Sequence, residues 1–197
     1  FRRVLFRSAQ SIKALPIRAD VSNEADVLRT YDEVLKAFGH LDVVVNNAGK
    51  GIFKPLLEMQ RSEFDAVQAT NIAGAMMMAR EAAKHFVTRK RGNIVNIGST
   101  ASHRGAPNGT AYYASKAALR SMTECWRAEL RQHNIRVFLV NPSEVVTGFA
   151  AASGFQQKVN ESKLRGEEIA HAVKAVLEMD DRGFTTELTV FATNPKD

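Results

Sequence analysis

Apolar runs along the chain alternate with longer amphipathic stretches. Three continuous runs are rich in β-branched residues and close with small or turn-forming residues: LDVVVNNAG, GNIVNIGS and IRVFLVNPS. Runs of this kind are typical of parallel strands that are buried on both faces. Two further strands are predicted, one in KALPIRADV at residues 13–21 and one in ELTVFAT near the carboxyl end.

The stretches between these strands carry apolar residues at helical spacing. The first predicted helix spans residues 22–39, with Ser22 as its N-cap and Gly39 as its stop. Two long helices are predicted at 61–87 and 109–134, and a shorter one at 163–180. Strands that alternate with helices predict an α/β fold, in which a doubly wound parallel sheet lies between two helical layers.

Ligands of such folds bind at the carboxyl ends of the strands. Residues 147–166 are small or polar with weak periodicity, and we expect them to form a loop or lid at that edge. The turn NNAG at 46–49 follows one strand, and its small residues let a flat ligand approach the backbone closely. Ser99 follows the next strand in the same way.

Tyr112 and Lys116 are four residues apart in a predicted helix, so they share one face. An ammonium about 4 Å from a phenol supplies roughly the 4 kcal/mol that moves a tyrosine pKa to neutrality. The pair is therefore a candidate acid–base unit. Tyr113 also shares a face with Lys116 at a spacing of three, and spacing alone does not choose between the two tyrosines.

Composition suits a single domain of 197 residues, 45% of them apolar. We expect that domain to span residues 9–197, because FRRVLFRS at residues 1–8 resembles a translated sequencing adaptor and is interpreted as an artefactual leader. The leader holds three of the arginines behind the net charge of +6, and the other basic residues are scattered. Neither nucleic-acid binding nor a membrane span is expected. The single cysteine, Cys125, is predicted to be a small core residue of a cytoplasmic protein.

Six short motifs occur in a fixed order: DV at 20–21, NNAG at 46–49, TNIAG at 70–74, NIGS at 96–99, YYASK at 112–116 and NPSEVVT at 141–147. The ordered set resembles the short-chain dehydrogenase/reductase superfamily over residues 13–194. The resemblance implies a Rossmann-like, three-layer fold. It also implies an oxidoreductase that uses NAD or NADP to interconvert a secondary alcohol and a ketone.

The resemblance assigns roles to individual residues. Tyr112 is implied to be the proton donor or acceptor, Lys116 to lower its pKa, Ser99 to orient the substrate, and Asn71 to organise a relay water. The positions implied to bind the dinucleotide are Asp20, Val21, Asn47, Ala48, Gly49, Tyr112, Lys116, Pro142, Val145 and Thr147. No metal site is expected.

The chain departs from the family pattern at two places. Ser143 and Glu144 follow Pro142 where the family has Pro-Gly, so the loop on the nicotinamide side is expected to differ. The Gly-rich turn that would cradle the pyrophosphate has no counterpart between Phe1 and Lys13. We therefore expect a fragment that lacks the first β-α-β unit and has little or no activity. The residue that selects NAD or NADP would lie in that unit.

Several alternatives stay open at this point. The parent protein could be a cofactor-binding regulator without turnover, and the chain itself could be an inert truncated product. The substrate could be a 3-oxoacyl thioester, a sugar, a steroid or a small hydroxy acid, and His103 and Arg104 could touch an acidic one. The resemblance implies a homodimer or homotetramer of the parent through the two long helices, where Met76, Met77, Met78 and Phe86 are candidate contacts.

Overall fold

The computed structural model describes residues 13–157 and 161–194, so the predicted leader lies outside the described residues. Its centre is a sheet of four parallel strands in the order β1-β2-β3-β4. The strands are β1 (Val43–Asn46), β2 (Gly92–Ile97), β3 (Ile135–Pro142) and β4 (Glu187–Val190). Each of the three apolar runs and ELTVFAT contributes one strand, and the predicted α/β class is confirmed.

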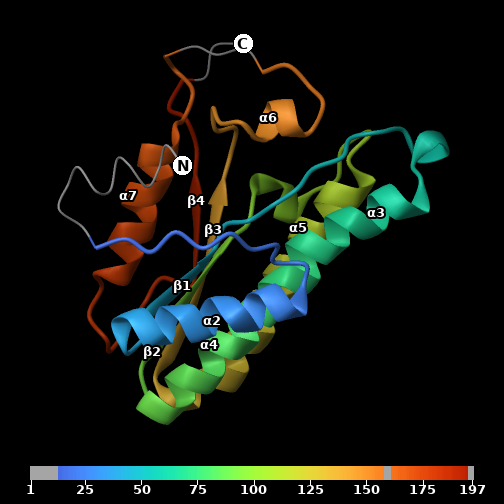
Figure 1. Cartoon of the computed structure of the whole chain (residues 1–197). Helices are drawn as coiled ribbons and strands as arrows, with labels where there is room; N and C mark the ends of the chain where they lie inside the picture. Colours follow the sequence, from blue (N-terminus) through green and yellow to red (C-terminus); the bar gives the residue numbers. More distant parts are fainter. Residues whose placement is uncertain (1–12, 158–160, 195–197) are drawn as a thin grey trace.

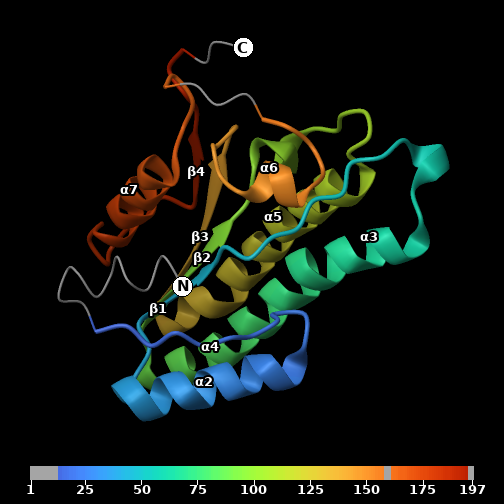
Figure 2. The same cartoon turned by 45° about the horizontal axis from the view of Figure 1, so that its top comes forward.

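Helices cover both faces of this sheet, as Figures 1 and 2 show. The helices α2 (Glu24–Phe38), α4 (Ala75–Arg89) and α5 (Thr110–Leu130) lie on one face, and α7 (Gly166–Leu177) lies on the other. The shorter elements are α3 (Arg61–Gln68), α6 (Phe149–Ala152), η1 (Leu56–Glu58), η2 (Ala69–Gly74), η3 (Thr100–His103) and η4 (Arg131–His133). No helix within the described residues is long and apolar enough to cross a membrane.

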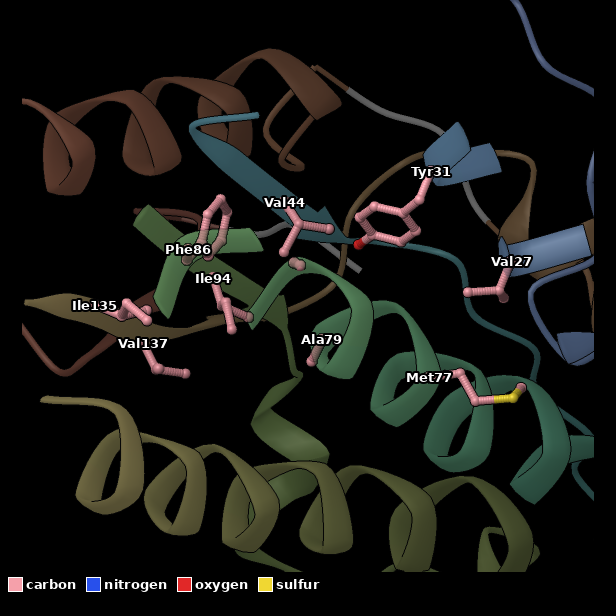
Figure 3. Close-up of a cluster of buried hydrophobic side chains, with 10 residues drawn as sticks. Val27, Tyr31, Val44, Met77, Ala79, Phe86, Ile94, Ile135 and Val137 are labelled. Carbon is pink, nitrogen blue, oxygen red and sulfur yellow. The ribbon is translucent and has the colours of Figure 1, made fainter. Parts of the chain in front are cut away.

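The larger core fills the space between the sheet and the helices α2 and α4 (Figure 3). Phe86 and Ile94 are fully buried there, and the Tyr31 hydroxyl donates a hydrogen bond to the Met78 carbonyl. Gly92 makes room for the Phe86 ring, because a β-carbon at residue 92 would stand 2.1 Å from the ring atom Cγ. Phe86 and Met77 are thus core residues of this chain.

Residues 13–21 do not form the strand that their sequence predicts. A strand needs a neighbour to satisfy its backbone hydrogen bonds, and within the described residues this stretch lies against α2 instead. The Lys13 ammonium donates to the Ala37 carbonyl and lies 4.7 Å from the centre of the Phe38 ring. The Arg29 guanidinium donates to the Arg18 carbonyl.

Two smaller predictions are also wrong. The N-cap of α2 is Asn23, whose side-chain oxygen accepts from the Ala25 and Asp26 amides, whereas Ser22 donates to the Asp20 carboxylate. Cys125 is exposed rather than buried, because it lies on the solvent side of α5.

The long helix predicted at 61–87 is interrupted. It divides into α3, a π-helical segment at Ala69–Gly74 and α4. A π-helical turn widens the helix and turns side chains away from their regular positions, and such turns are frequent at functional sites. This one carries Asn71.

Candidate active site

Asn71 ties the loop after β1 to the helix α5. Its side-chain oxygen accepts from the Lys50 amide at 2.8 Å, and its side-chain nitrogen donates to the Lys50 carbonyl at 2.9 Å. The same nitrogen donates to the Ser115 hydroxyl at 2.9 Å. Only 2% of Asn71 is exposed, so these contacts fix the loop that follows the NNAG turn.

Lys116 extends from α5 toward the end of β2. Its ammonium donates to the Ile97 carbonyl at 2.8 Å and lies 5.7 Å from the centre of the Tyr112 ring. The residue is 6% exposed, and burial lowers the pKa of the ammonium to about 8. The structure therefore holds a buried amine beside the phenol, one helical turn away.

Tyr112 and Ser99 meet at the same edge of the sheet. Burial raises the pKa of the Tyr112 phenol, and a side-chain hydrogen bond with Ser99 opposes that rise. The spacing of Tyr112 and Lys116 predicts that the ammonium lowers this pKa toward neutrality. The structure differs because the ammonium is directed to the Ile97 carbonyl and burial dominates. The phenol is therefore protonated at neutral pH.

The neighbouring Tyr113 has different surroundings. Its ring packs on Gly109, where a β-carbon would stand 2.3 Å from the Tyr113 atom Cδ2. The two tyrosine rings lie 6.1 Å apart at a steep angle. Of the two tyrosines that spacing leaves open, Tyr112 is the one whose pKa responds to the Ser99 hydroxyl.

Asn141, at the end of β3, fixes the backbone of Ser99. Its side-chain oxygen accepts from the Ser99 amide at 3.1 Å and from the Ser102 hydroxyl at 3.3 Å. Its side-chain nitrogen donates to the Glu187 carboxylate at 2.6 Å, and His103 contacts the same carboxylate at 2.8 Å. The His103 side chain therefore contacts Glu187 of β4.

The turn at residues 47–49 exposes its backbone at the end of β1. A β-carbon at Gly49 would stand 3.8 Å from both the Asn71 side-chain oxygen and the Lys116 ammonium. A flat ligand lying against this turn would therefore reach the buried amine. These residues fit the ribose and nicotinamide end of a dinucleotide, whose hydroxyls accept hydrogen bonds from an ammonium.

The other predicted cofactor positions lie along the same edge. Val21 packs on Gly74 of the π-helical segment, where a β-carbon would stand 2.8 Å from its side chain, and Asp20 precedes it at the surface. Pro142 is buried at the end of β3. Thr147 lies at the surface, and its hydroxyl accepts from the Phe149 amide.

Val145 and Glu144 hold the segment after β3. Val145 pairs with Leu164 in an isolated parallel bridge, and the Val146 amide donates to the Leu164 carbonyl at 2.8 Å. The Lys163 ammonium lies 2.9 Å from the Glu144 carboxylate, and only 5% of the Lys163 side chain is exposed. The predicted lid is therefore attached to the end of β3 by a short clasp, defined here as residues 144–146 with 163–164.

Three phenylalanines beside Tyr112 were not predicted as site residues. The rings of Phe53 and Phe149 lie 5.3 and 5.4 Å from the Tyr112 ring, and the Phe155 ring lies 5.4 Å from that of Phe53. They come from the loop after β1 and from the lid around α6. No local pattern marks them, because only the tertiary fold brings these two segments together.

Within the described residues, no group of three or more His, Cys, Asp or Glu side chains could hold a metal ion. The chemistry of this edge rests on a phenol, a hydroxyl, a buried amine and backbone turns. These are groups for proton transfer and hydrogen bonding.

Comparisons with known proteins agree with this architecture. An oxidoreductase of Staphylococcus aureus (strain USA300), itself uncharacterized, is 30% identical over 187 residues, which are 93% of this chain and 77% of the relative. An alcohol dehydrogenase of the archaeon Thermococcus sibiricus, solved with 5-hydroxy-NADP, has a TM-score of 0.87 at 27% identity, covering 98% of this chain and 82% of that one. An NAD+-bound xylitol dehydrogenase has a TM-score of 0.82 at 28% identity, with 98% and 85% covered.

The sequence model of the short chain dehydrogenase family matches residues 5–158. That range contains the NNAG turn, Ser99, the Tyr112–Lys116 pair and the segment after β3. The parallel sheet, the ordered motifs and the relatives all lead to one assignment: the chain belongs to the short-chain dehydrogenase family and is an oxidoreductase by descent.

Proposed function

We propose that the parent protein, of which this chain is expected to be a fragment with little or no activity of its own, interconverts a secondary alcohol and a ketone, with NAD or NADP as cofactor. The observation that carries this proposal is the placement of the Tyr112 phenol, whose pKa the Ser99 hydroxyl lowers against the effect of burial, with the buried Lys116 amine one helical turn away. Two solved relatives, one with bound 5-hydroxy-NADP and one with bound NAD+, support the proposal that a dinucleotide binds at this edge.

The exposed turn at Asn47, Ala48 and Gly49 would hold the ribose of the dinucleotide, with the Lys116 ammonium donating to its hydroxyls. Asp20 and Val21 would lie beside the adenine, and Pro142, Val145 and Thr147 beside the nicotinamide. The cofactor supplies a hydride to the carbonyl carbon, or accepts one from the alcohol carbon. The protein supplies the position of the substrate and the proton.

The Tyr112 phenol serves as the acid for reduction. Because burial keeps it protonated at neutral pH, it can donate its proton to the carbonyl oxygen as the carbon receives the hydride. The Ser99 hydroxyl donates a second hydrogen bond to the same oxygen. The reduction would leave an alcohol, an oxidised dinucleotide and a phenolate, and the phenolate would regain its proton from solvent.

Lys116 and Asn71 support that return of the proton. An amine with a pKa of about 8 exchanges protons readily near neutral pH, and it stabilises the phenolate by its charge when protonated. Asn71 uses both of its side-chain donors on Lys50 and Ser115. One lone pair of its side-chain oxygen stays available for a relay water.

The test is the substitution Tyr112→Phe, compared with the matched control Tyr113→Phe. Loss of the phenol hydroxyl removes the proton donor, and general acid catalysis of this kind contributes about 100- to 10,000-fold. In the full-length protein with its amino-terminal unit restored, we expect ketone-dependent oxidation of NADPH or NADH to fall by at least about 100-fold in Tyr112→Phe and to change less than about threefold in Tyr113→Phe.

Cofactor affinity separates a catalytic role from a binding role. A fluorescence titration with NADPH and NADH is expected to give the same dissociation constant for the wild-type chain and Tyr112→Phe, because the phenol hydroxyl acts on the carbonyl oxygen. Turnover retained in Tyr112→Phe, or lost equally in Tyr113→Phe, would contradict the assignment of Tyr112 as the acid.

A further inference from the structure

Two phenylalanine rings lie beside the Tyr112 ring, on which the proposed function rests, and a third lies behind one of them. Phe53 lies at 5.3 Å and 49° from the Tyr112 ring, and Phe149 at 5.4 Å and 51°. Phe155 then meets Phe53 edge-on, at 5.4 Å and 90°. We define the three phenylalanines as the ring wall. A substrate whose carbonyl oxygen meets Tyr112 and Ser99 must lay its neighbouring group along this wall.

The ring wall closes around one point of the backbone, at Gly51. A β-carbon at residue 51 would stand 2.7 Å from Phe149 Cζ, 2.8 Å from Phe53 Cε2 and 2.9 Å from the Ser153 hydroxyl oxygen. Glycine is the residue that leaves this space to the rings. The loop after β1 and the lid around α6 therefore meet through aromatic contacts at residue 51.

The Ser153 hydroxyl is the polar group at this point. Its oxygen is buried, and among the described residues it has no hydrogen-bond partner. A buried hydroxyl without a partner is costly, by about 1–3 kcal/mol in mutational data. A polar substituent of a bound ligand would satisfy it.

The charged side chains nearby are directed elsewhere. The Lys54 ammonium pairs with the Glu63 carboxylate, and His103 lies 2.8 Å from Glu187. Glu144 is paired with Lys163. These pairs occupy the three charged groups, and the rings of Phe53 and Phe149 are what lies beside the Tyr112 ring.

We propose that the ring wall selects aromatic carbonyl compounds that carry a polar ring substituent, and that Ser153 hydrogen-bonds that substituent. The inference rests on the proposed function of Tyr112 and Ser99. Aromatic pairs at centroid distances of 4.5–7 Å attract beyond their buried area. A substrate ring beside Phe53 and Phe149 would gain this attraction, whereas a sugar would lose hydrogen bonds to water there.

The first experiment measures binding without turnover, by saturation-transfer NMR on the full chain. The probes are 4-hydroxyacetophenone, acetophenone and the polar ketone dihydroxyacetone. We expect 4-hydroxyacetophenone to bind more tightly than acetophenone, and dihydroxyacetone to show no transfer at the same concentration. Equal or tighter binding of dihydroxyacetone would overturn the proposal.

Variants then locate the binding to the ring wall. Phe149→Ala is expected to weaken 4-hydroxyacetophenone at least about tenfold, whereas Phe191→Ala, which removes a ring that is 67% exposed near the end of β4, should leave it unchanged. Ser153→Ala should abolish the preference for the hydroxylated ketone. Because Phe149→Ala could destabilise the lid, Phe149→Leu and Gly51→Ala are measured beside it, with thermal melting as a check of folding. Equal affinities in the Phe149, Gly51 and Phe191 variants would overturn the proposal.

A second experiment separates this inference from the proposed function. The same three ketones are offered, with NADPH and with NADH, to the full-length protein with its amino-terminal unit restored, and cofactor oxidation is followed by absorbance. Binding of the aromatic ketones without reduction supports the ring wall and contradicts the proposed catalysis. Reduction of dihydroxyacetone but not of the aromatic ketones supports the catalysis and overturns the ring wall.

Discussion

Lys116 buries an ammonium inside the protein, with 6% of the residue exposed and one hydrogen bond to the Ile97 carbonyl. Burial places its pKa at about 8, below the ordinary value of 10.5. Between these two pH values the unfolded chain binds more protons than the folded one, so this group makes the protein more stable as pH rises from 8 to 10.5. Below pH 8 the folded protein carries the full cost of the buried charge.

We therefore predict a pH-dependent difference between the wild-type chain and Lys116→Met. The free energy of unfolding of the wild type, relative to that of Lys116→Met, should increase by roughly 3 kcal/mol as the pH rises from 8 to 10.5. Urea denaturation at several pH values measures it. Lys174→Met, which removes a lysine on the solvent side of α7, is the control. A difference that is constant over this pH range would show that Lys116 is charged equally easily in both states.

At the residue scale, the sequence indicates which groups can meet but not how they point. The spacing of Tyr112 and Lys116 places both on one face of α5, and the structure agrees. The direction of the Lys116 ammonium depends on the Ile97 carbonyl of β2. Helical spacing in α5 does not predict where that carbonyl lies. The sign of the Tyr112 pKa shift follows from burial, a property of the packed site.

The lid is attached to the sheet by the clasp of residues 144–146 with 163–164. Lys163 holds the pKa of the Glu144 carboxyl below its ordinary value, and Gln157 donates a further hydrogen bond to it. A carboxyl with a lowered pKa contributes stability above its unfolded pKa near 4.5, and the contribution is lost as pH falls through the lowered value. The clasp should therefore be complete at neutral pH and open in acid.

We predict that Glu144→Gln loosens the clasp at neutral pH. The substitution leaves the Lys163 ammonium buried without its counter-charge, so local opening becomes easier. Hydrogen exchange at the Val146 amide, which donates to the Leu164 carbonyl, should accelerate roughly tenfold at pH 7, and the two proteins should converge as pH falls through the lowered pKa of Glu144. Glu178→Gln, on an exposed pair with Lys174, is the control. Unchanged exchange at Val146 would show that the backbone bridge holds the lid alone.

At the element scale, predictions succeed where local forces suffice. The β-branched run at Val43–Asn46 and the stop at Gly39, whose φ of 78° suits glycine, follow from local sequence. Residues 13–21 are also predicted as a strand but have, within the described residues, no partner strand, and the π-helical turn at Ala69–Gly74 has no local signal. Both depend on contacts between elements that are far apart in the chain.

The whole molecule has two unequal cores on opposite faces of one sheet. Among the residues that the structure describes, the core with α2 and α4 contains ten buried residues, and the core with α7 contains four. The ring wall belongs to neither, because it forms where the loop after β1 meets the lid. Its residues could not be predicted from sequence, since nothing in either segment indicates the other.

The two faces of β1 differ in their exposure to solvent, as the neighbouring residues Val44 and Val45 show. Val44 points into the larger core and is 7% exposed, whereas Val45 points to the α7 face and is 43% exposed, because α7 packs mainly against β3 and β4. We predict that Val44→Ala lowers the free energy of unfolding by about 2 kcal/mol, from two lost methyl groups and the cavity they leave. Val45→Ala should cost less than about 0.5 kcal/mol. Urea midpoints at constant m-value measure both, and equal losses would mean that the α7 face of β1 is covered in solution.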